Sequence, residues 1–189
     1  MSRVDTECQQ CGEKLDIQRS CRPARYCSGR CRTAAYRARK VRVPKELRTQ
    51  KRWVRWTRGK RPIQPDGSPA STGVPGTWTS YARVREHTQI GYVLGDGVGC
   101  IDLDHCLTSD GKLTAAAERF LEQMPSTWIE VSPSGDGLHI WGRLPESVGR
   151  RIVQDDGLHV ETYSRGRYIT VTGKRFRNAP CRLAALPVP

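Results

Sequence analysis

The sequence is 189 residues long and carries a formal net charge of +13, a length that suits one domain of ordinary size with a small appendage. No stretch approaches the ~20 apolar residues of a membrane-spanning helix, and charged residues occupy the N-terminus, where a secretory signal has an apolar run. These features argue against a membrane-embedded or secreted protein and predict a soluble, cytoplasmic one.

The basic residues are concentrated in the first third of the chain. Residues 1–62 contain 19 Lys and Arg against 5 Asp and Glu, whereas residues 63–189 contain 13 against 14. A segment this basic indicates a polyanionic partner, and nucleic acid is favoured over a membrane because no long apolar or amphipathic segment accompanies the charge. The alternative is a solvated basic tail.

Five of the eight cysteines lie between positions 8 and 31, in paired spacings. In a reducing compartment such pairs indicate metal binding rather than disulfides. The sequence predicts a tetrahedral zinc site with Cys8, Cys11, Cys27 and Cys31 as ligands, and Cys21 is a spare thiol that could replace one of them. The basic side chains of the helix expected next suit nucleic-acid phosphates; they are Arg32, Arg37, Arg39 and Lys40.

These patterns divide the chain into four parts. Residues 1–40 are predicted to be a basic zinc-binding module with four cysteine ligands, and residues 41–52 a basic linker or helix. Residues 53–180 are predicted to form the main domain, and residues 181–189 a C-terminal tail.

Beyond residue 90 the sequence predicts short strands with one helix among them. In chain order we expect strands over 92–94 and 98–104, a helix over 113–124, strands over 128–132 and 138–142 joined by a turn at 133–137, and a hairpin of 158–163 with 167–172. This order predicts an α+β domain with helices on one face of a largely antiparallel sheet.

Alternation along these strands separates apolar from polar side chains. One phase is apolar and suits a core beneath helices: Ile101, Leu103, Ile129, Val131, Leu138, Ile140, Leu158, Val160, Ile169 and Val171. The opposite phase carries Asp102, Asp104, His139 and Glu161 on three separate strands. The alternative interpretation is that this phase is the solvent-exposed face of an ordinary sheet. So many ionisable groups in one phase nevertheless favour a functional site.

Paired carboxylates on one face need a compensating cation. Asp102, Asp104 and Glu161 are therefore predicted to hold one or two Mg²⁺ or Mn²⁺ ions for phosphoryl chemistry. The glycine-rich turn over 132–137 exposes backbone amides beside the Ser134 hydroxyl, which suits a triphosphate, and His139 follows it as a hydrogen-bond donor.

Three motifs occur in a fixed order: Cys-Ile-Asp-Leu-Asp-His at 100–105, Ser-Pro-Ser-Gly-Asp-Gly-Leu-His-Ile at 132–140, and His-Val-Glu-Thr-Tyr at 159–163 followed by Arg-Tyr-Ile-Thr-Val-Thr-Gly at 167–173. Together they resemble the archaeo-eukaryotic primase superfamily, and most of all the bifunctional primase-polymerase domains of phages, plasmids and other mobile elements. The segments 60–62 and 73–78 resemble the upstream part of that domain. The resemblance covers about residues 50–178 and implies a sheet related to RNA-recognition folds.

By position, the resemblance implies catalytic metal ligands and nucleotide contacts. The metal ligands are Asp102, Asp104 and Glu161, and the contacts with the phosphates of the incoming nucleotide are Ser134, His139, Lys60, Arg165 and Arg167. Residues 53–180 would then be a DNA primase-polymerase domain that extends or starts strands from NTPs or dNTPs on a single-stranded DNA template with a primer, in a bacterial host.

Other functions remain open at this point. Because no Gly-x-x-x-x-Gly-Lys-Ser/Thr loop occurs, a separate helicase is expected. One alternative is a zinc-dependent DNA-binding replication accessory protein with a non-catalytic domain. Another is a nuclease that uses the same carboxylates with His105, although strand alternation points His105 into the core.

Overall fold

A computed structural model describes residues 8, 11, 13–15, 25–33 and 43–187. The chain divides into two compact units, Met1–Arg42 and Val43–Pro189, and each is described by itself. In the smaller unit residues 29–33 are helical, and Cys8 and Leu15 are buried. The predicted helix residues Arg37, Arg39 and Lys40 and the spare Cys21 lie outside the described residues.

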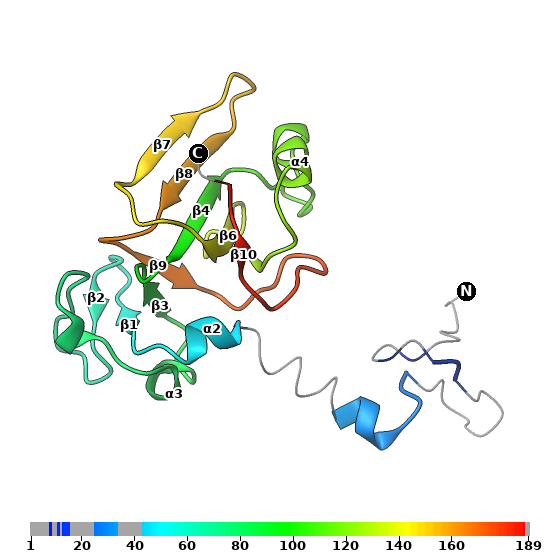
Figure 1. The fold of residues 1–189 in the computed structure, drawn as a ribbon, viewed down its shortest axis with the longest axis horizontal. Coiled ribbons are helices and arrows are strands. Elements are labelled where there is room, and N and C mark those ends of the chain that lie inside the picture. The colour runs from blue at the N-terminus through cyan, green and yellow to red at the C-terminus, as the bar shows by residue number, and fades with distance from the viewer. Residues whose placement is uncertain (1–7, 9–10, 12, 16–24, 34–42, 188–189) are drawn as a thin grey trace. The chain divides into compact units, whose positions relative to one another are not determined.

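The larger unit contains two sheets (Figure 1). One has four strands in the order β2–β1–β3–β9, and the other has six, in the order β10–β6–β4–β8–β7 with β5 paired to β6. The strands are β1 (Trp53–Trp56), β2 (Pro62–Ile63), β3 (Ile90–Val93), β4 (Val98–Asp104), β5 (Ile129–Val131), β6 (Leu138–Arg143), β7 (Arg150–Val153), β8 (His159–Tyr163), β9 (Tyr168–Val171) and β10 (Ala184–Ala185). All named pairs are antiparallel except β10 with β6. The predicted α+β class with largely antiparallel strands is confirmed.

The named helices of the larger unit are short. They are α2 (Lys45–Arg48), α3 (Tyr81–Val84) and α4 (Ala115–Glu122), with a 3₁₀ turn at Pro75–Thr77. Helix α4 begins after Thr114, whose hydroxyl accepts a hydrogen bond from the Ala117 amide at 3.3 Å and so caps a free backbone donor. Its apolar residues pack on the six-stranded sheet against Ile101, Leu103 and their neighbours, where the predicted core phase lies.

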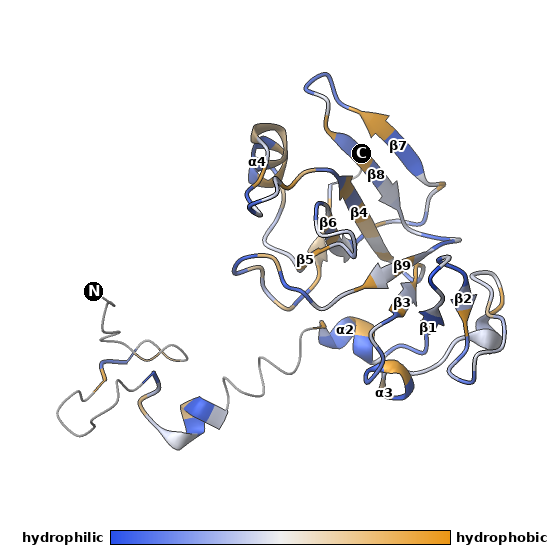
Figure 2. Ribbon diagram, turned by 180° about the vertical axis from the view of Figure 1, so that it is seen from behind, coloured by the Kyte–Doolittle hydropathy of each residue, from blue (hydrophilic) through white to orange (hydrophobic). Residues whose placement is uncertain are grey.

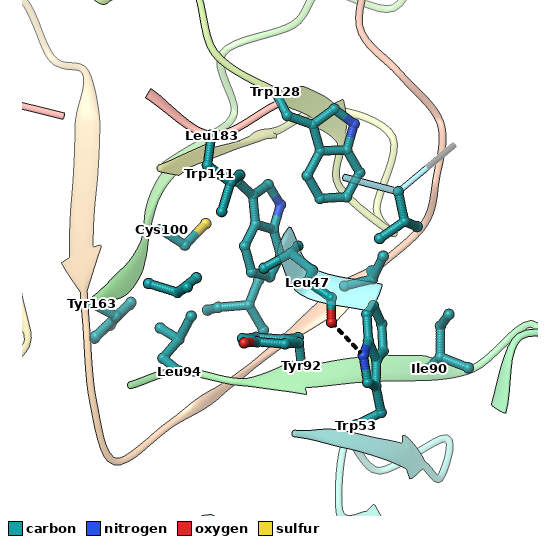
Figure 3. Packing of buried hydrophobic residues seen from close by; sticks show 14 of the residues in the cluster. Leu47, Trp53, Ile90, Tyr92, Leu94, Cys100, Trp128, Trp141, Tyr163 and Leu183 are labelled. Atoms are coloured by element: carbon teal, nitrogen blue, oxygen red, sulfur yellow. Dashed lines mark hydrogen bonds between the residues drawn. The ribbon is translucent and has the colours of Figure 1, made fainter. Parts of the chain in front are cut away.

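A second core joins the two sheets (Figure 3). Trp53 and Tyr92 of the four-stranded sheet pack in one cluster with Cys100 and Trp141 of the six-stranded sheet. The indole of the fully buried Trp53 donates a hydrogen bond to the Leu47 carbonyl at 3.0 Å, which attaches α2 to this core. The face of the six-stranded sheet that is turned away from α4 is thus apolar where the four-stranded sheet packs on it. Asp102, His139 and Glu161 lie on the same face, outside the area that the four-stranded sheet covers.

The predicted hairpin of 158–163 with 167–172 is wrong. Strand β8 pairs with β4 and β7, whereas β9 pairs with β3 in the other sheet. Ile169 and Val171 consequently pack in the core between the sheets and not beneath α4. The turn at 164–167, in which Gly166 has φ +68°, carries the chain from one sheet to the other.

The segments outside the expected main domain also contribute to the larger unit. Within residues 41–52, the side chain of Leu47 is fully buried. Within residues 181–189, β10 pairs with β6, and Leu183 and Leu186 are buried in the two cores. None of the helices in the described ranges has the length and apolar character needed to cross a membrane.

Candidate active site and metal centre

A row of ionisable side chains crosses the six-stranded sheet. Backbone register aligns one residue from each of five neighbouring strands, in the order Glu130 (β5), His139 (β6), Asp102 (β4), Glu161 (β8) and Arg151 (β7). Asp104 follows two residues after Asp102 and therefore lies on the same face. The sequence predicted that these carboxylates and His139 share a face, and the register places them in adjacent positions on it.

Asp102 lies at the centre of the row and its side chain is 21 % exposed. Burial raises the pKa of Asp102, and the like charges of Asp104 and Glu161 add to the rise, while His139 and Lys60 act against it. The positively charged groups of the protein therefore do not fully compensate the negative charge of the Asp102 carboxylate. A bound divalent cation would supply the missing positive charge.

His139 is 4 % exposed and lies between two carboxylates. Its Nδ1 is 3.3 Å from Glu130 Oε1, and its Nε2 is 3.7 Å from Asp102 Oδ1. Burial alone would lower the pKa of His139, but the hydrogen bond to Glu130 and the charges of Asp102 and Glu130 outweigh it, so the pKa is raised. Because a carboxylate only accepts, Nδ1 carries a proton and Nε2 is the nitrogen that faces Asp102.

Glu130, like Arg151, belongs to the row but was not predicted as a site residue. Its side chain is fully buried. Oε2 accepts hydrogen bonds from the Thr172 amide, the Thr172 hydroxyl and the Gly173 amide at 2.7–3.1 Å, and Oε1 accepts one from Trp141 Nε1 at 3.2 Å. Donors on both oxygens hold this buried carboxylate in one position. The sequence feature that could have indicated Glu130 is a glutamate in an otherwise apolar strand that forms a hairpin with the strand of His139.

Glu161 is turned towards basic and phenolic partners. Arg151 Nε lies 2.5 Å from Glu161 Oε1, and the Tyr163 hydroxyl donates to Oε2 at 2.5 Å. Arg167 Nη1 is 4.0 Å from Oε2. Asp102, Asp104 and Glu161 therefore share a face but do not gather around one point. Both oxygens of Glu161 are already engaged by Arg151 and Tyr163.

The glycine-rich turn joins β5 to β6 as predicted. Ser134 donates a short hydrogen bond to Asp136 Oδ1, and its hydroxyl lies 2.8 Å from that of Ser132. The hydrogen bond from Ser134, and then the pairing with His105, lower the pKa of Asp136. His105 Nδ1 is 2.7 Å from Asp136 Oδ2 and its side chain is 80 % exposed. The prediction that His105 points into the core is wrong, because β4 ends at Asp104 and His105 takes a left-handed conformation with φ +49°.

The remaining predicted phosphate contacts flank the row. Lys60 is exposed in the turn between β1 and β2, with φ +55°, and its carbonyl accepts a hydrogen bond from the Tyr168 hydroxyl at 2.7 Å. It is close enough to Asp102 to lower the pKa of that carboxyl. Arg165 and Arg167 flank Gly166 and line a surface pocket beside Arg151.

The donor set of the row fits a hard divalent cation. Its three carboxylates supply the oxygen ligands that Mg²⁺ and Mn²⁺ prefer, on adjacent strands and next to the under-compensated Asp102. A cation held there would compete with Arg151 and Tyr163 for the oxygens of Glu161.

The four predicted zinc ligands form a second centre in the smaller unit. The sulfurs of Cys8, Cys11, Cys27 and Cys31 all lie within 4.8 Å of one another. The Cys8 amide donates to the Glu13 carbonyl at 2.8 Å, which closes the turn around the first pair. In the absence of a cation, the sulfurs of Cys11 and Cys31 raise the pKa of the Cys27 thiol to about 12. The arrangement suits a tetrahedral zinc ion, which ionises thiols at neutral pH.

Comparison with known proteins gives two findings. The family described as "Bifunctional DNA primase/polymerase, N-terminal" matches residues 33–187. The chain is also 34 % identical over 146 residues to the DNA primase-polymerase of Nitratiruptor phage NrS-1, an alignment that covers 70 % of this chain and 20 % of that protein. The chain thus spans about a fifth of the length of this curated relative.

Proposed function

The chain belongs to the family of bifunctional DNA primase/polymerases, and from this we propose that it is a metal-dependent nucleotidyltransferase in the replication of a phage or another mobile element. It extends or starts strands on a single-stranded DNA template. Residues 53–180 carry the chemistry, and residues 1–40 provide a basic, zinc-dependent contact with nucleic acid. The separate helicase expected from the sequence remains a prediction.

The carboxylates of the row are the proposed metal ligands. Asp102, Asp104 and Glu161 would hold one or two Mg²⁺ or Mn²⁺ ions, which when bound stabilise the charge on the attacking and leaving oxygens of nucleotidyl transfer. Support comes from the register that puts Asp102 opposite Glu161 and from the raised pKa of Asp102. Until a cation binds, Arg151 compensates Glu161.

The proposed nucleotide side of the row is the β5–β6 hairpin. Glu130 fixes the ring of His139 so that Nε2 faces the carboxylates, where it can donate to a phosphate oxygen. The turn after β5 supplies the Ser134 hydroxyl and backbone amides for the same triphosphate. Lys60 approaches from the other sheet and adds positive charge near Asp102.

The observation that carries this proposal is the adjacency of Asp102 to both His139 and Glu161 in a chain of this family. The direct test is extension of a labelled primer on a DNA template with Mn²⁺ and dNTPs or NTPs. We expect Asp102→Asn and Asp104→Asn to lower the rate by about two to three orders of magnitude, because each removes a charged metal ligand.

The matched control is Asp110→Asn, which removes an exposed carboxylate that pairs with Lys112. It should leave extension unchanged. Binding of primer–template by all three variants should match the wild type. Extension that persists in Asp102→Asn and Asp104→Asn would refute the catalytic role, and binding without any extension by the wild type would favour the non-catalytic accessory protein.

A further inference from the structure

A basic pocket lies on the side of Glu161 away from His139. It has a volume of about 420 Å³ and is lined by Gly149, Arg151, Tyr163, Arg165, Gly166 and Arg167. Three of the six lining residues are arginines and none is acidic. Figure 2 shows that β7, which supplies Arg151, runs from a hydrophilic start to a hydrophobic end. The lining indicates an anionic ligand.

The pocket is built around the ring of Tyr163. A Cβ at Gly149 would lie 2.5 Å from this ring, so only glycine leaves the ring in its present position. The Arg167 guanidinium carbon is 4.1 Å from the ring centroid, and the hydroxyl is held by Glu161. Tyr163 itself is only 6 % exposed. The wall of the pocket is therefore fixed directly to a proposed metal ligand.

The arginines keep donors available for a ligand. Arg151 makes its contacts with Glu161 and with the Tyr163 hydroxyl through Nε, and its side chain is 70 % exposed. The side chain of Arg167 is 50 % exposed, and Arg165 is exposed in the turn. Guanidinium groups with free terminal nitrogens bind phosphate in a bidentate manner.

The order of the residues in the row indicates which phosphate group the basic pocket would bind. His139 lies on one side of Asp102, and Glu161 followed by Arg151 lies on the other. In an in-line displacement the attacking hydroxyl and the leaving group are on opposite sides of the phosphorus atom. If the triphosphate is bound by Ser134 and His139, the attacking 3′-hydroxyl and the strand that ends in it approach from the β7 side.

We propose that the pocket of Arg151, Arg165 and Arg167 binds the phosphodiester backbone of the primer strand near its 3′ end. This inference rests on the proposed function. It adds Arg151 to the substrate contacts, and it assigns Arg165 and Arg167 to the strand in place of the incoming nucleotide.

The test is equilibrium binding of the full chain to a fluorescent primer–template, which needs no nucleotidyl transfer. The substitution Arg165→Gln leaves the Arg151–Glu161 pair intact, and we expect it to weaken binding about threefold at about 0.1 M salt. The double substitution Arg151→Gln/Arg165→Gln should weaken binding about tenfold and reduce the slope of log K against log[salt] by about 2. The control Arg177→Gln, at an exposed arginine outside the pocket, should change neither.

Methylphosphonate linkages, which lack the phosphate charge, identify the strand. Placed in the last two positions of the primer, they should weaken binding by the wild type and have little further effect on the double variant. If methylphosphonates in the template strand, and not those in the primer, weaken binding by the wild type but not by the double variant, the assignment to the primer is wrong. Unchanged primer–template affinity in the double variant with a raised KM for the nucleotide would also overturn the assignment. A protein that shows the primer coupling but extends no primer would contradict the proposed function and leave the pocket assignment standing.

Discussion

Glu130 determines how His139 is presented to the carboxylates. It is fully buried and its two oxygens accept hydrogen bonds from Trp141, Thr172 and Gly173 as well as His139. We expect Glu130→Gln to destabilise the larger unit by about 3 kcal/mol, because it removes one partner of a buried ion pair and replaces an acceptor with a donor. Chemical unfolding followed by tryptophan fluorescence measures this, and Glu122→Gln on the exposed end of α4 is the control. Equal stability of the two variants would contradict the role of Glu130.

The same pair predicts a pH dependence. The pKa of His139 is raised in the folded chain above its ordinary value of 6.5. A raised folded pKa contributes stability that is complete below about pH 6.5 and is lost as the pH rises through the folded value. The stability difference between the wild type and Glu130→Gln should therefore be larger at about pH 6 than at about pH 8.5. A difference that does not change with pH, measured by the same unfolding experiment, would mean that His139 is neutral in the fold.

The position of strand β10 depends on a glycine in β6. A Cβ at Gly142 would lie 2.4 Å from Leu186 Cγ and 2.6 Å from the Ala184 carbonyl oxygen. We expect Gly142→Ala to cost about 1–3 kcal/mol of unfolding free energy, because the backbone of β10 must move away from β6. The substitution Gly76→Ala, where nothing lies within 4 Å, should change stability by less than about 0.5 kcal/mol. Similar values for both variants would show that β10 is not held against β6.

The sequence predicts the strands that carry the row, the face on which its carboxylates lie and the local pairing of β5 with β6, but not the pairing of β8 and β9. Alternation correctly placed Asp102, His139 and Glu161 on one face, because side-chain direction is a local property of a strand. It could not show that β8 and β9 belong to different sheets, since pairing depends on contacts far apart in the sequence. Arg151 was missed for a related reason: the sequence Arg-Arg-Ile-Val of the edge strand β7 does not alternate.

The two units can be followed by independent measurements. All five tryptophans lie beyond residue 52, in the unit Val43–Pro189, and the cluster of four cysteines lies in the unit Met1–Arg42. We expect removal of zinc by a chelator to unfold residues 1–35 and weaken binding of single-stranded DNA, because so small a module depends on its metal. The denaturation midpoint reported by tryptophan fluorescence should stay the same.

Cys27→Ser should reproduce the effect of the chelator, whereas Cys181→Ser, at an exposed cysteine outside the cluster, should not. Protein purified without chelator that contains no zinc would refute the zinc site. Unchanged DNA affinity after zinc is removed would separate the module from nucleic-acid binding.

The proposed catalytic role of the row depends on where the cation binds in the larger unit. The most direct measurement is anomalous diffraction at the manganese edge from crystals of the full chain soaked with Mn²⁺ and a non-hydrolysable nucleotide. We expect a manganese peak within ligand distance of Asp102, Asp104 and Glu161. The triphosphate should lie towards Ser134 and His139, and Arg151 should no longer be bound to a Glu161 oxygen that the ion takes. A nucleotide bound with its manganese away from these three carboxylates would contradict it.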